Sequence, residues 1–485
     1  MARVSYLLAG MLMSAQLAHA ADQGSAAPAP VEVAPLAGSH AVSTVIPAPA
    51  PTATASMDSV PSASMADEAA QQQQQAARAK KMIGLLRATV KETKPQRGFF
   101  SGLFSSSVRP IDTELLAETG RFIERYPALP DTAEVYQLRA QVHQRIDAYQ
   151  AAAVDWLLSL AAYPDSAFAV EAHNNLKALV GDQLKQQAKV LQDLIVKVDS
   201  VEGDREQRVA DLLAYMGTLN DKDFAGPVAD ACISFLMRNR DYTGQDRVLD
   251  ALARQKALLD SQSAIYYFEQ LLSLYPDSAL RPDAMLGIAD VQRNGLKHYE
   301  EAATSYKSLI AKYPDSDKTK LGYEALAGMY DENMHNYSNA IKTYDAIIAR
   351  YNNDPVVLRS LQAQALIYQN KTSQPLEAIA DYRKLEELFK GKEGLAALLD
   401  AEQLARYTVS DWKLAIDINH RIINDYPDSK EAPKALFANA GIYEEKLKDK
   451  DQALKLYQLF LSHYPGDDLA VQAKQRISAL QQKKN

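Results

Sequence analysis

Histidine, cysteine and glycine-rich motifs are the features of this chain that could carry chemistry. The eight histidines could bind a metal ion or transfer protons, but they form no HExxH pair and no zinc-ligand spacing with cysteine. His298 and His335 occupy nearly equivalent places in a sequence repeat, which explains them better than metal binding does. The sequence contains no phosphate-binding glycine loop and no GxSxG nucleophile motif. We therefore expect no catalytic residue, no metal site and no cofactor.

The composition is that of a chain that folds around an apolar core without disulfides. Of its 485 residues, 47% are hydrophobic and 24% are charged. The single cysteine, Cys232, lies in the apolar run 231–237, so burial is the interpretation we favour; an intermolecular bridge or a reactive thiol is the alternative. The formal net charge of −8 argues against nucleic acid or an anionic membrane as the main partner.

The first twenty residues predict a cleaved export signal. Arg3 supplies a positive charge, residues 4–17 are apolar, and Ala18, His19 and Ala20 fit the small-x-small cleavage rule. This run is too short to span a membrane, and no later stretch reaches the necessary length. We expect a soluble periplasmic protein without a membrane span, and no lipid anchor because no cysteine lies near the cleavage point.

Two segments separate this signal from the remainder. Residues 21–70 are rich in Ala, Pro and Ser and almost free of charge, which predicts a disordered tether. Residues 71–110 predict a helix followed by a flexible insert at 98–107, rich in Phe, Gly and Ser. The insert either docks on the folded body or contacts a membrane or partner.

From Ile111 onward the organising feature is a repeat that ends in an aromatic-Pro-Asp-Ser tetrad. Proline stops one helix, and the Asp or Ser that follows can cap the next. After Tyr275 the tetrads are 38, 38, 38, 37 and 38 residues apart, and more degenerate repeats occupy 111–274. The tetrads, several of them incomplete, begin at Tyr126, Tyr163, Tyr275, Tyr313, Tyr351, Phe389, Tyr426 and Tyr464.

Small and large side chains alternate within each regular repeat of residues 275–485. Alanine recurs at Ala289, Ala327, Ala365 and Ala440 in the first half, and at Ala302, Ala340, Ala378 and Ala453 in the second. Each alanine of the second set is followed four residues later by a tyrosine. Alanine lets two helices approach closely and tyrosine fills the adjoining groove, so we expect an all-α solenoid of stacked hairpins.

This pattern resembles the tetratricopeptide repeat. Ala327 and Tyr330 match the small and aromatic pair of its first helix, Ala340 and Tyr344 match the second, and Pro355 matches the closing proline. The period here is longer than the usual length of about 34 residues. In this respect the chain is similar to repeats of bacterial envelope proteins, such as the Tol–Pal-associated division coordinator and the outer-membrane barrel-assembly lipoprotein.

The resemblance implies a binding groove along the first helix of each hairpin. The side chains at the corresponding positions are mixed in charge, and an ordinary solvated helix face is the alternative interpretation. They include no basic clamp for a C-terminal carboxylate. The positions are Asp283, Asp290, Arg293 and Asn294; Glu324, Asp331 and Glu332; Arg359, Gln362, Gln369 and Asn370; and Lys434, Phe437, Glu444 and Glu445.

These observations lead to two hypotheses about function. The first is a non-catalytic periplasmic scaffold that binds other proteins of the bacterial envelope, with association with an outer-membrane complex as one possibility. The second is an accessory module for peptidoglycan or an exported polysaccharide in a division or secretion complex. Sugars stack on exposed aromatic rings, whereas the repeat pattern places most tyrosines inside, which favours the scaffold.

Overall fold

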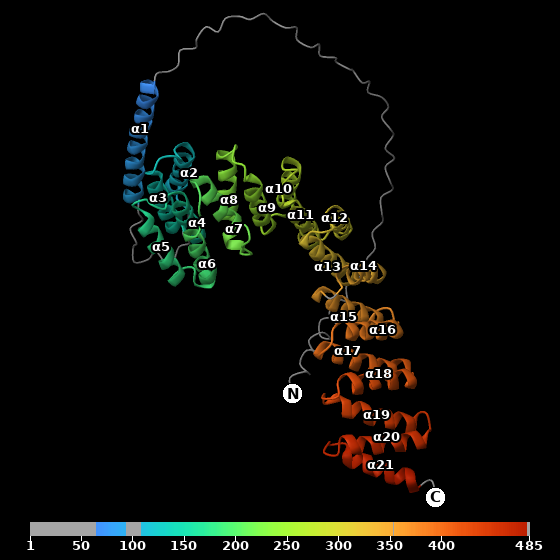
Figure 1. The fold of residues 1–485 in the computed structure, drawn as a ribbon. Coiled ribbons are helices and arrows are strands. Elements are labelled where there is room, and N and C mark those ends of the chain that lie inside the picture. Colours follow the sequence, from blue (N-terminus) through green and yellow to red (C-terminus); the bar gives the residue numbers. More distant parts are fainter. Residues whose placement is uncertain (1–64, 94–107, 353, 483–485) are drawn as a thin grey trace, which may run out of the picture. The chain divides into compact units, whose positions relative to one another are not determined.

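A computed structural model describes residues 65–93, 108–352 and 354–482 of the chain (Figure 1). Across these ranges the chain forms twenty-one α-helices and three short η segments, with no strand. The prediction of an all-α solenoid of helical hairpins is confirmed. The expected signal peptide at 1–20, the insert at 98–107 and most of the tether lie outside the described residues. Helix α1 (Met65–Glu92) begins within the stretch 21–70 that we expect to be disordered.

The first part of the described chain is an irregular group of helices. Helix α1 packs against α2 and α3 through one side of its second half, where Ala79, Ile83, Leu86 and Val90 are buried. The elements that follow α1 are α2 (Pro110–Arg125), α3 (Thr132–Arg145), α4 (Tyr149–Ala162), α5 (Ala169–Gly181), η1 (Lys185–Gln187), α6 (Ala188–Asp199), α7 (Arg205–Met216), α8 (Lys222–Arg238), α9 (Gln245–Ala257) and α10 (Ser261–Leu274).

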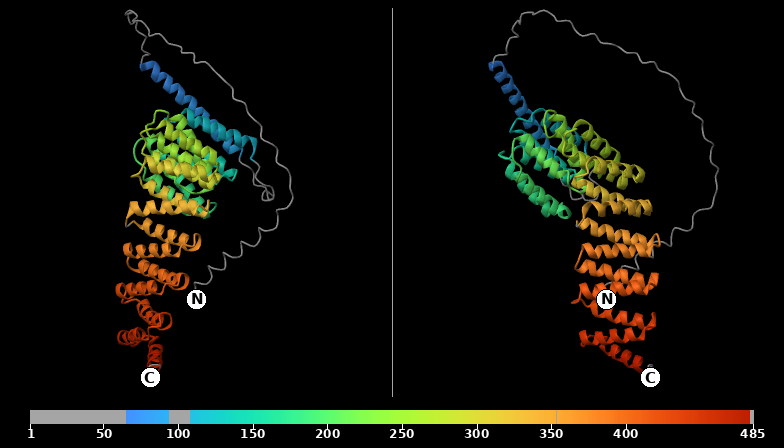
Figure 2. Two further views of the ribbon diagram at one scale, coloured as in Figure 1. Left: turned by 90° about the vertical axis from the view of Figure 1, so that its right-hand side faces the viewer. Right: turned by 45° about the vertical axis from the view of Figure 1, so that its right-hand side comes forward.

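The second part is a regular series in which each helix packs against the next (Figure 2). The helices run close to the boundaries that the tetrads predict. The elements are α11 (Arg281–Asp290), η2 (Val291–Leu296), α12 (Tyr299–Lys312), α13 (Asp317–Glu332), α14 (Tyr337–Tyr351), α15 (Pro355–Asn370), α16 (Pro375–Leu388), α17 (Lys392–Gln403), η3 (Leu404–Val409), α18 (Trp412–Asp425), α19 (Glu431–Glu445), α20 (Lys450–His463) and α21 (Ala470–Gln482).

The recurring alanines and tyrosines form the core of this regular part, as predicted. Tyr306 and Tyr457 are at most 1% exposed, and Tyr344 and Tyr382 are less than a tenth exposed. Burying these rings removes large apolar surfaces from water and so stabilises each hairpin against its neighbours. The alanines at the two helix crossings are all fully buried: Ala289, Ala327, Ala365, Ala440, Ala302, Ala340, Ala378 and Ala453.

Two kinds of turn set the repeat length. Between hairpins the tetrad serine accepts a backbone hydrogen bond from the next helix; the Oγ atom of Ser316, for example, lies 3.2 Å from the nitrogen of Lys318. Within hairpins the turn that follows the first helix contains a residue in the left-handed conformation, with φ between 52° and 61°. None of these residues is glycine, and they recur at the repeat period: Lys297, His335, Ser373, Ser410 and Lys448.

Helix α4 organises the irregular part. It packs against α3, α5, α6, α7 and α8, and eleven of its fourteen residues are buried. The ring of Trp156 is fully buried, and its Nε1–H donates to the Oε1 of Gln137 at 2.7 Å. Cys232 of α8 is also fully buried, which raises the pKa of its thiol and confirms its interpretation as a core residue.

Candidate functional site

The predicted groove residues all lie on the first helices of their hairpins. They occupy α11 with its continuation η2, then α13, α15 and α19. Helix α13 packs against both α11 and α15, so the predicted residues of these three helices lie on one set of neighbouring elements. Those of α19 lie further along the chain, with α17 and η3 between them and α15.

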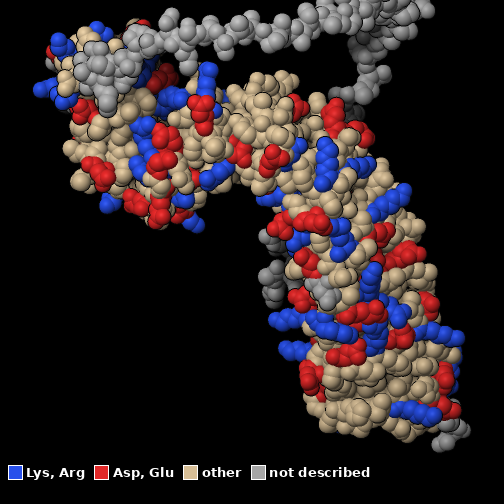
Figure 3. Space-filling view, turned by 45° about the horizontal axis from the view of Figure 1, so that its top comes forward, with Lys and Arg blue, Asp and Glu red and all other residues tan. Residues whose placement is uncertain are grey.

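Most charged residues of this predicted groove are already paired with a neighbouring repeat. The guanidinium of Arg359 lies 2.5 Å from the carboxylate of Glu324, and Arg293 lies 3.5 Å from that of Glu332. Figure 3 shows acidic and basic side chains interleaved over the repeats in this way. Such exposed pairs contribute about 0–1 kcal/mol each, but they neutralise the surface. Arg476 of α21 pairs similarly with Glu444 and Glu445.

Core tyrosines also reach acids of the predicted groove. The hydroxyl of Tyr306 donates to the Oδ1 of Asp290 at 2.5 Å, and that of Tyr457 donates to the Oε2 of Glu444 at 3.0 Å. Burial raises the pKa of Asp290, although the bond from Tyr306 and the nearby Arg293 act against this rise. These two carboxylates therefore hold the hairpins together rather than facing a ligand freely.

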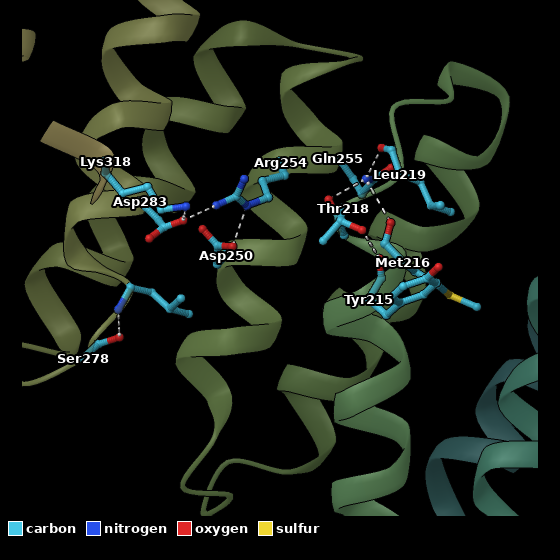
Figure 4. A network of polar contacts seen from close by, with 12 residues as sticks. Tyr215, Met216, Thr218, Leu219, Asp250, Arg254, Gln255, Ser278, Asp283 and Lys318 are labelled. Atoms are coloured by element: carbon cyan, nitrogen blue, oxygen red, sulfur yellow. Dashed lines mark hydrogen bonds and ion pairs between the residues drawn. The ribbon is translucent and has the colours of Figure 1, made fainter. Parts of the chain in front are cut away.

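Asp283 belongs to a structural network at the start of the regular part (Figure 4). Its Oδ1 lies 3.0 Å from Nη2 of Arg254 and 2.8 Å from Nζ of Lys318, while Arg254 also pairs with Asp250 at 2.6 Å. Next to them, the Nε2 of the fully buried Gln255 lies within hydrogen-bond distance of three carbonyl oxygens. Those carbonyls belong to Met216, Gly217 and Leu219, at the end of α7 and in the turn that follows it. The network fastens α7, α9, α11 and α13 together.

The predicted groove residues that remain available are mainly uncharged amides. Their side chains are exposed and make no hydrogen bond or ion pair with any residue the structure describes. The available residues are Asn294, Gln362, Gln369, Asn370 and the cationic Lys434. Asp331 differs from them because it is half-buried, and burial together with the neighbouring Glu332 raises its pKa.

A cavity of about 530 Å³ lies outside the predicted groove, in the irregular part. Its lining comes from α2, α3, α4, α7 and α8. Helix α8 contributes an unusual pair, Gly226 and Pro227, in the middle of a helix, and a Cβ atom on Gly226 would meet no other atom within 4 Å. The missing side chain of Gly226 therefore leaves space on this face of α8.

A buried ion pair supports one wall of this cavity. The Nε of Arg139 lies 2.8 Å from Oδ1 of Asp155, and Nδ1 of His143 lies 2.9 Å from Oδ2 of the same carboxylate. Burial opposes ionisation of Asp155, but Arg139 and His143 outweigh it and keep its pKa below the usual value. Both carboxylate oxygens are engaged, so the cluster fixes α3 against α4 and leaves Asp155 a poor general base.

Three segments of the chain match a known repeat family. Residues 249–278, 283–316 and 435–467 match the model of the tetratricopeptide repeat family. These three segments of the chain are tetratricopeptide-type repeats. Each matched segment covers one hairpin, namely α9 with α10, α11 with α12, and α19 with α20. No curated protein matches the sequence.

Solved structures of tetratricopeptide repeat type align with most of the chain but only loosely. Yeast Tom70 is 14% identical, covering 86% of this chain and 95% of its own, with a TM-score of 0.23. The TPR domain of P58(IPK) is 15% identical, covering 83% and 97%, with a TM-score of 0.21. The Cut9-Hcn1 hetero-tetramer of the APC/C is 14% identical, covering 84% and 81%, with a TM-score of 0.24. The assignment of these hairpins as tetratricopeptide repeats therefore rests on the matched segments and the observed packing.

The cavity precedes the matched tetratricopeptide repeats, and the sequence analysis missed it. Its ion pair joins residues on different helices, and no motif links Arg139 to Asp155. The glycine and proline inside the apolar α8 are the one sequence signal that could have directed attention there.

No described helix is long and apolar enough to cross a membrane, and the described side chains form no cluster suited to a metal ion.

Proposed function

We propose that this protein is a non-catalytic scaffold that binds partner proteins along its tetratricopeptide repeats in the periplasm. The observation that carries the proposal is the stack itself, in which core tyrosines and ion pairs between repeats hold the first helices α11, α13 and α15 together as one surface. A surface of this kind can engage an extended peptide or a helix through contacts spread over several repeats. The exposed amides of α15, Gln362, Gln369 and Asn370, are suited to such contacts.

Sequence features support the location of this scaffold in the bacterial envelope. Residues 1–20 have the pattern of an export signal, and residues 21–70 have the composition of a tether. The period of 37 or 38 residues resembles that of envelope repeat proteins, which supports a role in envelope assembly or an outer-membrane complex. A reporter enzyme that is active only after export, fused to the C-terminus, tests this location; removal of residues 2–20 should abolish its activity.

Binding of a glycan is the second candidate function. The exposed amides on α15 favour it, because amide groups hydrogen-bond well with sugar hydroxyls. The burial of Tyr306, Tyr344, Tyr382 and Tyr457 weakens it, since these rings cannot stack on sugars. Binding of solubilised peptidoglycan and exopolysaccharide to the purified chain distinguishes this candidate from the scaffold.

Site-specific photocrosslinking in cells tests the scaffold function directly. A photoreactive residue replaces Gln369 on α15 in the full chain, and a matched control replaces Glu300, which is exposed on the second helix α12. We expect covalent adducts with a protein partner from position 369 and few from position 300. A lack of protein adducts from position 369 and from the other exposed groove positions would contradict the scaffold function.

A further inference from the structure

The cavity in the irregular part has an apolar lining that is open to a partner. Leu116 of α2, Leu158 of α4 and Ile233 of α8 line it, and Met237 of α8 is 63% exposed beside them. A volume of about 530 Å³ can hold several side chains. Methionine adapts its shape readily to apolar ligands, so its exposure at this edge favours binding of apolar groups.

The charge left unpaired around this lining is mainly acidic. Glu124 of α2 and Asp230 of α8 line the cavity, are exposed, and form no hydrogen bond or ion pair with any other described side chain. Arg139 is bonded to Asp155, and Glu124 acts on it only at longer range. Arg238 lines the cavity too, and its Nε–H donates to a carbonyl of its own helix at 3.0 Å, which leaves its charge without an ion pair among the described residues. Two unpaired carboxylates therefore face one unpaired guanidinium at this lining.

We propose that the cavity binds an amphipathic segment of a partner protein in which basic side chains alternate with apolar ones. Apolar side chains would cover the lining around Met237, and lysine or arginine would pair with Glu124 and Asp230. Such complementary charges select the partner and its orientation more than they add affinity. The inference rests on the proposed scaffold function and specifies the chemistry of one partner.

Binding of two matched fluorescent peptides to the purified full chain tests this inference. One peptide is an amphipathic helix of leucine and lysine, and the other carries glutamate in place of every lysine. We expect the lysine peptide to bind at least about tenfold more tightly at moderate salt. The double variant Glu124→Gln and Asp230→Asn should reduce its affinity by about tenfold, and Met237→Ser should weaken it further.

A variant of equal net charge controls for general attraction to an acidic protein. Glu114 of α2 and Asp193 of α6 are exposed and do not line the cavity, so Glu114→Gln with Asp193→Asn should leave peptide binding unchanged. Equal affinity for the two peptides, or equal losses in the two double variants, would overturn the inference. So would a cavity variant that changes only the oligomeric state, because a second copy of the chain would then be the occupant.

Photocrosslinking separates the failure of this inference from failure of the scaffold function. The photoreactive residue is placed at position 237 and compared with position 369 in the same cells. Protein adducts at both positions, together with the peptide preference, support the inference. Adducts at position 369 alone leave the scaffold function intact and overturn the proposed use of the cavity.

Discussion

The helices around α4 and the repeats from α11 onward bury their apolar surface in different ways. Helix α4 is surrounded by five helices and is buried over most of its circumference. A regular second helix such as α12 buries only one face, through Ala302, Ala303, Tyr306 and Leu309. A helix that buries one face keeps the helical period in its sequence, whereas a helix that is surrounded loses it. The cavity of about 530 Å³ in the irregular part is lined by five helices, whereas the cavity of about 330 Å³ in the regular part is lined by the three consecutive helices α12, α13 and α14.

The first way to test this comparison is to remove the centre of the irregular part. Trp156→Ala deletes a fully buried ring and leaves the Oε1 of Gln137 without its donor. We expect a loss of about 5 kcal/mol in the free energy of unfolding, measured by urea titration with circular dichroism. Trp156→Phe keeps most of the ring and should cost only about 1–2 kcal/mol. A loss below about 2 kcal/mol for the alanine variant would mean that α4 is not the organising helix.

The matching change in the regular part is Tyr344→Ala. Its ring is 8% exposed in the core between α13, α14 and α15, so we expect a loss of about 3 kcal/mol. The effect should be confined to neighbouring repeats, because stability in a repeat array accumulates from local interfaces. Hydrogen exchange should show faster exchange in α13 to α15 and little change in α4. Tyr407→Ala is the control, since this ring is 71% exposed and its removal should cost less than about 0.5 kcal/mol.

The sequence was sufficient for the regular part because its neighbours are fixed by the period. The spacing of Ala302 and Tyr306 alone indicates which residues meet the next helix. The groove positions could be inferred from the resemblance to the tetratricopeptide repeat, but the ion pairs between them could not. Arg359 and Glu324, for example, meet only through the angle between adjacent repeats. The cavity and its lining could not be predicted, because the glycine and proline inside α8 do not indicate which helices pack beside them. Glu124 and Asp230 are more than a hundred residues apart, and their helices, α2 and α8, are brought together by the packing of α2 on α3, of α3 on α4 and of α4 on α8.

A half-buried acid makes the regular part sensitive to pH. Burial, aided by the nearby Asp345, raises the pKa of Asp381 on α16 to about 7. Because this value lies above that of the unfolded chain, the contribution of Asp381 to stability is fully present below about pH 4 and is lost as the pH rises through 7. Asp381→Asn should therefore stabilise the protein at pH 8 by about 1–2 kcal/mol, allowing for partial solvent screening, and by less at pH 5. Urea titrations at the two pH values measure this difference, and equal effects at both would contradict the shift.

The smallest expected effect concerns the left-handed residues in the turns within the hairpins of the regular part. Ser373 and Ser410 have φ values of 54° and 58°, which cost a residue with a Cβ atom about 1 kcal/mol relative to glycine. Replacing serine by glycine removes this cost, but glycine also makes the unfolded chain more flexible, which offsets part of the gain. Ser410→Gly should therefore stabilise the protein by about 0.5 kcal/mol. Ser478→Gly, within the exposed face of α21, should instead destabilise by about 0.5 kcal/mol. Melting temperatures of the two variants should move in opposite directions, and a fall for both would show that the left-handed turn stores no strain.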